Sequence, residues 1–99
     1  MIKLTEIRAS RRYTGSGAES YELHEVFINP QHVVAIREDH MAKQHLTEGR
    51  MPAGLDDRQS FTKIHLSRGQ NGIDITVIGT PTAIENKINV HGAKQLLRG

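Results

Sequence analysis

The chain has 99 residues, which is the length of one ordinary domain and leaves no room for a second hydrophobic core. It contains no cysteine, which excludes disulfides, thiolate zinc sites and cysteine nucleophiles and fits a cytoplasmic protein. The formal charge is only +2, with acidic and basic residues interspersed, so the composition weighs against a dedicated nucleic-acid binder. No apolar run approaches the roughly 20 residues that span a bilayer, so we expect neither a membrane segment nor a signal peptide.

Three strands are expected in the first part of the chain. Ile2, Leu4 and Ile7 indicate the first strand, with the alternation slipping near Glu6, and the β-branched and aromatic content of 21–28 indicates the second. Asn29 and Pro30 then interrupt the ladder, because proline lacks a donor and restricts the residue before it. A third strand over 32–37 is therefore expected to pair back on the second as a hairpin.

The polar segment from Glu38 to Gln59 is an insertion in this strand pattern. It is longer than an ordinary connection of about 4 to 6 residues, and loops of this kind are usually functional or mobile. Its first part, Asp39 to Thr47, is expected to form a short helix capped by Asp39, with Met41 and Leu46 as a thin apolar stripe.

The second half of the chain predicts a hairpin followed by a helix. Residues 61–66 and 73–78 are the clearest strands, and the glycine- and asparagine-rich segment between them predicts a tight turn. Thr80 is an expected N-cap, with Pro81 at the first helical position, where its missing N–H costs nothing. The helix is expected to end near Asn89.

These elements predict a single α+β domain over residues 1–99. The expected architecture is an antiparallel sheet of about five strands with one or two C-terminal helices, one of which covers a face of the sheet. Residues 93–99 form either a second short helix or a tail that orders only in an oligomer. A small core and exposed sheet edges predict assembly into dimers or larger oligomers.

No catalytic or metal-binding motif is present. The six histidines are scattered over different expected elements, and even His40 and His45 lie five apart, which is not the spacing of a tight ligand pair. The sequence has no nucleophile elbow, phosphate loop or paired-carboxylate signature. We therefore expect a binding protein rather than an enzyme, with no catalytic residue, cofactor or metal.

Phe61 is the first candidate for a binding residue. Strand alternation places it with Lys63 and His65, on the side opposite Ile64 and Leu66. A ring on such a mostly polar face either packs at an edge or serves as a stacking platform for a base. Chain order leaves both interpretations open.

Two arginines at strand ends are candidates for anion recognition. From Arg37 and Arg68 a guanidinium can fork onto phosphate oxygens while a strand holds its stem. The alternative is a surface ion pair, for example with Glu38 or Asp39. With a phenyl ring and an amide such as Asn71, these arginines would suit a phosphate-bearing nucleotide.

The beginning of the chain resembles the small FlbD-like family associated with flagellar operons. The resemblance rests on residues 1–5 and on the run 27–36, in which a strand is followed by an Asn-Pro turn and another strand. It implies a regulatory or structural adaptor that binds protein or nucleic acid through its sheet. The insertion from Glu38 to Gln59 departs from that compact pattern.

With this insertion, the chain resembles the phage-encoded Thoeris anti-defence proteins of the first type. The resemblance rests on residues 61–64, on Arg68 and Gly69, and on the run 74–81, and it spans most of the chain. Members of that family are sponges that bind a cyclic ADP-ribose isomer made by TIR-domain defence enzymes and withhold it without cleaving it. Some also bind cyclic oligonucleotides. The resemblance implies the same function here, in the host cytoplasm.

The Thoeris resemblance also implies roles for individual residues. Phe61 would stack on adenine, Arg37 would bind phosphate at a strand end, and Asn71 would donate hydrogen bonds from a turn. The family further uses basic residues of its C-terminal helical region at a subunit interface. The corresponding candidates here are two pairs spaced four apart, namely Lys87 with His91 and Lys94 with Arg98.

Overall fold

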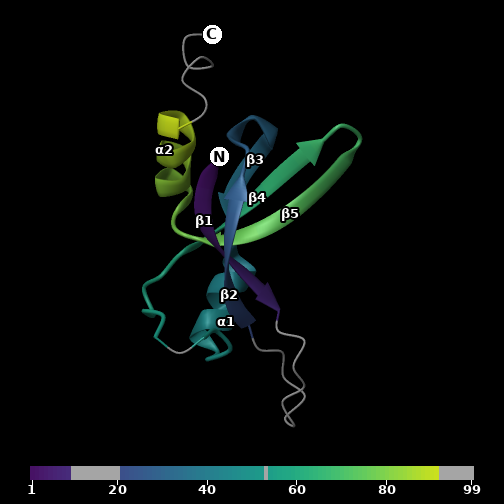
Figure 1. Cartoon of the computed structure of the whole chain (residues 1–99). Coiled ribbons are helices and arrows are strands. Elements are labelled where there is room, and N and C mark those ends of the chain that lie inside the picture. The colour runs from purple at the N-terminus through teal and green to yellow at the C-terminus, as the bar shows by residue number, and fades with distance from the viewer. Residues whose placement is uncertain (10–20, 53, 92–99) are drawn as a thin grey trace.

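The computed structural model describes residues 1–9, 21–52 and 54–91 (Figure 1). The elements, in chain order, are β1 (Ile2–Ala9), β2 (Tyr21–Ile28), the 3-10 turn η1 (Pro30–His32), β3 (Val33–Glu38), α1 (His40–Thr47), β4 (Phe61–Arg68), β5 (Asn71–Ile78) and α2 (Pro81–His91). In this part of the chain the strands form one antiparallel sheet of five, in the order β2-β1-β5-β4-β3. The expected α+β class is thus confirmed, while the residues expected to form a second C-terminal helix lie outside the described ranges.

The hairpin expected in the second half is present. β4 and β5 pair along their full lengths, and Arg68 pairs with Asn71 at the turn. Gly69 has a φ of 65° there, a conformation that L-residues rarely adopt. The tight two-residue connection therefore depends on this glycine.

The hairpin expected between the second and third strands is wrong. β2 and β3 lie at opposite edges of the sheet, where β2 pairs with β1 and β3 pairs with β4. The side chain of Asn29 accepts a hydrogen bond from the Gln31 amide and caps η1, in which Pro30 is buried. This turn carries the chain between the two edges. β1 and β2 pair over eight residue pairs, and in three of them, Ile2 with Ile28, Leu4 with Val26 and Ile7 with Leu23, both residues are apolar.

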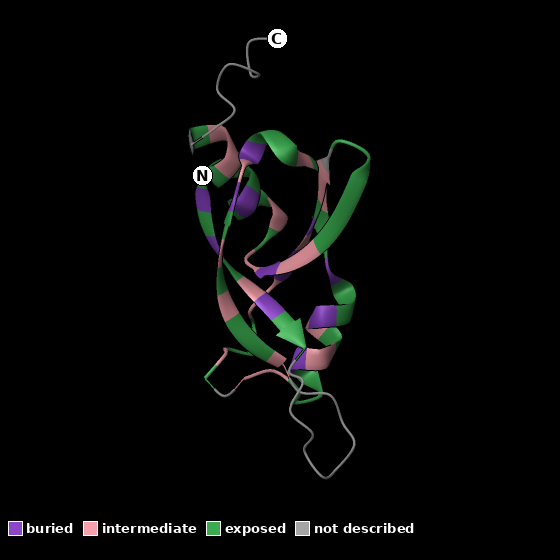
Figure 2. Cartoon of the chain, turned by 45° about the vertical axis from the view of Figure 1, so that its right-hand side comes forward, coloured by how far each residue is buried: buried purple, intermediate pink, exposed green. Residues whose placement is uncertain are grey.

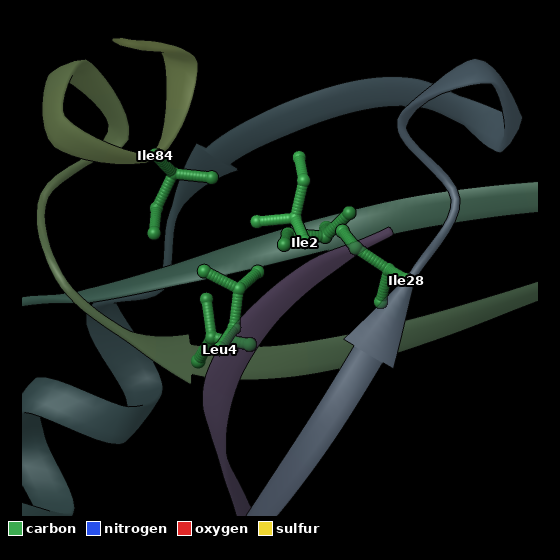
Figure 3. Packing of buried hydrophobic residues seen from close by; sticks show 6 residues of the cluster. Ile2, Leu4, Ile28 and Ile84 are labelled. Atoms are coloured by element: carbon green, nitrogen blue, oxygen red, sulfur yellow. The ribbon is translucent and has the colours of Figure 1, made fainter. Parts of the chain in front are cut away.

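One face of the sheet is covered by α2, and we call it the α2 face. Its core consists of Ile2, Leu4, Ile28, Ile64, Val77 and Ile84. Figure 3 shows Ile84 reaching from α2 toward Ile2 and Leu4. The N-cap predicted at Thr80 is confirmed, because its hydroxyl accepts a hydrogen bond from the Ala83 amide at 3.1 Å.

The opposite face carries a second core under α1, and we call it the α1 face (Figure 2). Its buried residues are Ile7, Ala42, Leu46 and Phe61. The expected helix and its Asp39 N-cap are confirmed. The expected apolar stripe is partly wrong, because Met41 is 62% exposed and Ala42 takes the buried position. The insertion therefore builds a second helical layer against the sheet.

Candidate functional site

A cavity of about 620 Å³ lies on the α2 face, between the end of β2 with η1 and the β4–β5 hairpin. Apolar side chains form most of its lining, namely Met1, Val26, Phe27, Ile28, Leu66, Ile73 and Ile75, and the polar lining residues are Asn29, His32, Ser67 and Asn71. We call this cavity the hairpin hollow.

The hollow exists because the two halves of the sheet diverge. β1 and β5 pair only at Glu6 with Val77 and at Ile7 with Thr76, whereas the pairings within each half are longer. In Figure 1 the hairpin leans away from β1 on one side of this crossing. The apolar residues that strand alternation directs to the α2 face are therefore left partly uncovered in the gap.

Several polar groups around the hollow have no partner among the residues that the structure describes. In the described residues, the side chains of Asn71 and His32 make no hydrogen bond or ion pair. The carbonyl oxygen of the Asn29 side chain is occupied by the Gln31 amide, which leaves its NH₂ group to donate. An apolar floor with a few such donors and acceptors is typical of small-molecule sites.

Two of the sequence-predicted residues lie at or beside the hollow. Asn71 lines it. Lys87 of α2 lines a smaller cavity of about 260 Å³ with Ile2 and Lys3, and Met1 borders both cavities. Among the predicted residues, the structure therefore brings an amide and a cation to this end of the α2 face.

Of the two interpretations left open for Phe61, the structure supports packing rather than a stacking platform. Its side chain is 0% exposed and packs with Ile7, Ala42 and Leu46. The alternation that groups it with Lys63 and His65 is correct, but α1 covers the Phe61 end of that face. A ring enclosed in this way is a core residue and has no free face for a base.

Arg37 is exposed on β3, and it lies away from the hollow on the α1 face. It pairs across strands with Lys63. Within the described residues it forms no ion pair, so the surface pair considered for it with Glu38 or Asp39 is absent. The backbones of Arg68 and His91 end β4 and α2, while their side chains, together with Lys94 and Arg98, lie outside what the structure describes.

No family model, curated protein or solved structure matches this chain.

The residues that sequence reasoning missed are those lining the hollow, above all Phe27 and Ile73. They are 57% and 60% exposed, although both are large and apolar. Each lies near a chain reversal, Phe27 before the Asn29-Pro30 turn and Ile73 after the hairpin turn. In the sequence, the only indication of this site is a large apolar residue close to each of two turns. The sequence does not show that the Asn29-Pro30 turn and the β4–β5 turn lie opposite each other.

A third cavity, of about 270 Å³, lies on the α1 face beside Asp39, Lys63 and Thr76. Its carboxylate already has structural partners, because Asp39 accepts hydrogen bonds from the Thr76 hydroxyl at 2.6 Å and the Ala42 amide at 3.0 Å. Burial by itself would raise the pKa of Asp39. The hydrogen bonds and the nearby Lys63 together have a larger effect in the opposite direction, so the pKa lies below its ordinary value. Asp39 thus serves to hold α1 on the sheet.

In the described ranges, no three His, Asp or Glu side chains come close enough together to hold a metal ion. No helix there is long and apolar enough to cross a membrane.

Proposed function

We propose that this protein binds a signalling nucleotide of the cyclic ADP-ribose type in the hairpin hollow and withholds it without cleaving it. The observation that carries the proposal is the hollow itself, with its apolar floor and unpaired amide groups. Its volume of about 620 Å³ lies within the range of about 300–1,000 Å³ usual for small-molecule sites. The resemblance to Thoeris anti-defence proteins supplies the ligand class.

The shape of the hollow suits the parts of such a nucleotide. A base or ribose ring would lie against Ile73, Ile75 and Leu66, while Asn71 offers both a donor and an acceptor to ring nitrogens or hydroxyls. Lys87 brings positive charge to the adjoining small cavity, toward which the phosphates would point. Lys3 also lines that cavity, but its ammonium is paired with Glu25. The stacking role expected of Phe61 has no part in this arrangement.

The lining residues support binding without cleavage. The hollow has no carboxylate in its lining, so His32 has no acid there to orient or charge it. The Ser67 hydroxyl faces the Gly69 carbonyl at 3.5 Å instead of an imidazole. Nothing in this arrangement activates a nucleophile against a phosphodiester or glycosidic bond.

Ligand release tests both parts of the proposal. The purified protein is titrated by calorimetry with cyclic ADP-ribose isomers, cyclic dinucleotides and linear ADP-ribose, then heated, and the released material is analysed by mass spectrometry. We expect a cyclic ADP-ribose isomer to bind and to return intact. Recovery of linear ADP-ribose would show an enzyme, and a panel in which nothing binds would favour the adaptor function of the FlbD-like alternative.

Two matched substitutions locate the site. Ile73 lines the hollow and Val34 does not, yet both side chains are about 60% exposed on strands. Ile73→Glu places a negative charge where an anionic ligand would lie, so we expect at least about a tenfold loss of affinity. Val34→Glu should leave the affinity unchanged, and neither variant should shift the melting temperature by more than a few degrees. Equal affinities in the two variants would remove the hollow as the site.

A further inference from the structure

The two edges of the sheet are protected against pairing to different degrees. β3 is short, carries Arg37 and has a register irregularity between Val33 and Ala35. β2 has eight residues in regular register, with no proline, lysine or irregularity. Charged side chains, above all lysine, together with proline and bulges are the usual means by which an edge strand is kept from pairing with another chain. β2 has no lysine, proline or bulge, and the charge of its Glu25 is offset by Lys3 of β1, so it is the edge more open to strand addition.

The backbone of β2 offers a defined set of free groups. The Tyr21 amide points away from β1, since it donates to the Arg50 carbonyl at 3.3 Å. Because the direction of these groups alternates along a strand, the amides and carbonyls of Leu23, Glu25 and Phe27 also point away from β1. In the described residues no other strand meets this edge.

The side chains of Leu23, Glu25 and Phe27 determine how well a second strand could pack beside β2. Leu23 is 41% and Phe27 57% exposed, and both lie on the α1 face with Glu25 between them. The Glu25 carboxylate lies 3.6 Å from the Lys3 ammonium, which offsets its charge. Glu22 shares a hydrogen bond with His24 at 2.9 Å. The edge is thus apolar at two positions, and the carboxylate between them is paired with a lysine.

We propose that β2 pairs with β2 of a second copy of this chain, antiparallel and with Glu25 opposite its own copy. In this register Leu23 of each chain lies opposite Phe27 of the other, so the outward backbone groups of all three residues find partners. The two exposed apolar side chains meet twice, once on each side of the two-fold axis. A shift by two residues leaves one of these positions unpaired. Leu23 and Phe27 lie two residues on either side of Glu25, so a two-fold axis at Glu25 pairs each of them with the other.

The dimer and the hollow share a border. Phe27 borders the hollow at the edge of the sheet, although its side chain lies on the α1 face, and it belongs to the proposed interface, so the second copy would lie beside the mouth. The interface consists of one strand pair and a few side chains, which is below the roughly 1,600 Å² of a standard stable interface. We therefore expect dissociation in the micromolar range.

Sedimentation measured over a range of protein concentrations tests the edge. Wild-type protein should pass from monomer to dimer in the micromolar range, and Leu23→Lys should weaken the dimer about tenfold or more by placing a charge in the interface. Val34→Lys, at the other edge, should leave the dimer unchanged. A wild type that stays monomeric at high micromolar concentration, or a dimer lost in Val34→Lys and kept in Leu23→Lys, would overturn the proposal.

Single cysteines test the register, because the chain has none of its own. Two Glu25 residues facing each other would have Cα atoms about 5.5 Å apart, within the range that a disulfide bridges. Two Leu23 residues would lie about 14 Å apart, four strand positions from one another. Under mild oxidation Glu25→Cys should therefore form a covalent dimer rapidly, while Leu23→Cys should not. Faster cross-linking of Leu23→Cys would exclude this register, and the result does not depend on any nucleotide.

Discussion

Phe27 and Phe61 are the two phenylalanines of the chain, and they occupy opposite environments. Phe61 is fully enclosed between the sheet and α1, whereas Phe27 is 57% exposed at the edge strand. Both lie on the α1 face by strand alternation. The difference arises from the cover that α1 provides at one end of that face.

This contrast predicts unequal effects of the same substitution. Phe61→Ala should lower the free energy of unfolding by about 3–5 kcal/mol, because it removes a buried ring and leaves a cavity. Phe27→Ala should lower it by about 0.5 kcal/mol or less when measured below the concentration at which dimers form. Urea unfolding followed by circular dichroism gives both values. Equal losses would show that the Phe61 ring is not enclosed.

Asp39 links the insertion to the sheet through three groups. Its carboxylate accepts from the Ala42 amide at the start of α1 and from the Thr76 hydroxyl on β5, and Lys63 of β4 contributes a positive charge nearby. Despite burial, which acts in the other direction, these contacts hold the pKa of Asp39 below its ordinary value. The charged form is therefore the one that stabilises the fold.

The depressed pKa predicts how stability changes with pH. Above the unfolded-state pKa of about 3.9 both states are ionised, and the contribution of Asp39 is fully present. As pH falls below this value the unfolded chain takes up a proton first, and the contribution is lost as pH reaches the lower pKa of the folded state. Asp39→Asn should thus be less stable than wild type at pH 7, by about 1–2 kcal/mol. Chemical unfolding at a series of pH values should show the gap narrowing below about pH 4, and a constant gap would contradict a role for the charge.

At the scale of elements, the junction between β5 and α2 depends on Gly79. Its φ is 128°, its amide donates to the Ser60 carbonyl, and its carbonyl accepts from the Thr62 hydroxyl at 2.8 Å. A Cβ at this position would lie 3.2 Å from Cδ1 of Ile84. The junction is held on both sides, so the backbone cannot relax without losing these hydrogen bonds.

Gly79→Ala should therefore destabilise the protein by about 1–3 kcal/mol or more. Gly54→Ala is the matched control, because Gly54 also has a positive φ, of 98°, but a Cβ there would meet no atom within 4 Å. Gly54→Ala should lower the free energy of unfolding through backbone strain alone. We expect its effect to be smaller than that of Gly79→Ala by about 1 kcal/mol or more, because only Gly79→Ala also crowds a core side chain. Thermal unfolding of the two variants provides the comparison. A larger loss in Gly54→Ala would show that the contact with Ile84 is unimportant.

At the scale of the whole molecule, one sheet separates two cores. The α2 face buries the larger set of aliphatic residues, and the α1 face buries Phe61 and its neighbours (Figure 2). The short β1–β5 crossing joins these layers and lets the β4–β5 hairpin diverge from β2. The hollow results from this divergence, whereas β2 lies at an edge because it ends the strand order, with no further strand beside it in the described residues.

The sequence by itself determined the elements of this protein and the local chemistry of their ends. The Asp39 and Thr80 caps and the β4–β5 hairpin are local properties of neighbouring residues, and the structure confirms them. The turn is shorter than expected, because Asn71 already belongs to β5 and only Gly69 has a positive φ there. Asn71 lines the hollow, and the local sequence pattern did not show which residues lie opposite it.

The tertiary structure decided which strands pair and which faces are covered. The chain places β2 next to β3 in sequence, yet β2 pairs with β1 over eight residue pairs, and the hairpin expected at Asn29-Pro30 does not form. Phe61 shares a strand face with polar residues, yet an insertion of more than twenty residues returns to cover it. Both outcomes depend on contacts between segments far apart in the chain, and the local periodicity of a strand carries no information about what packs against it.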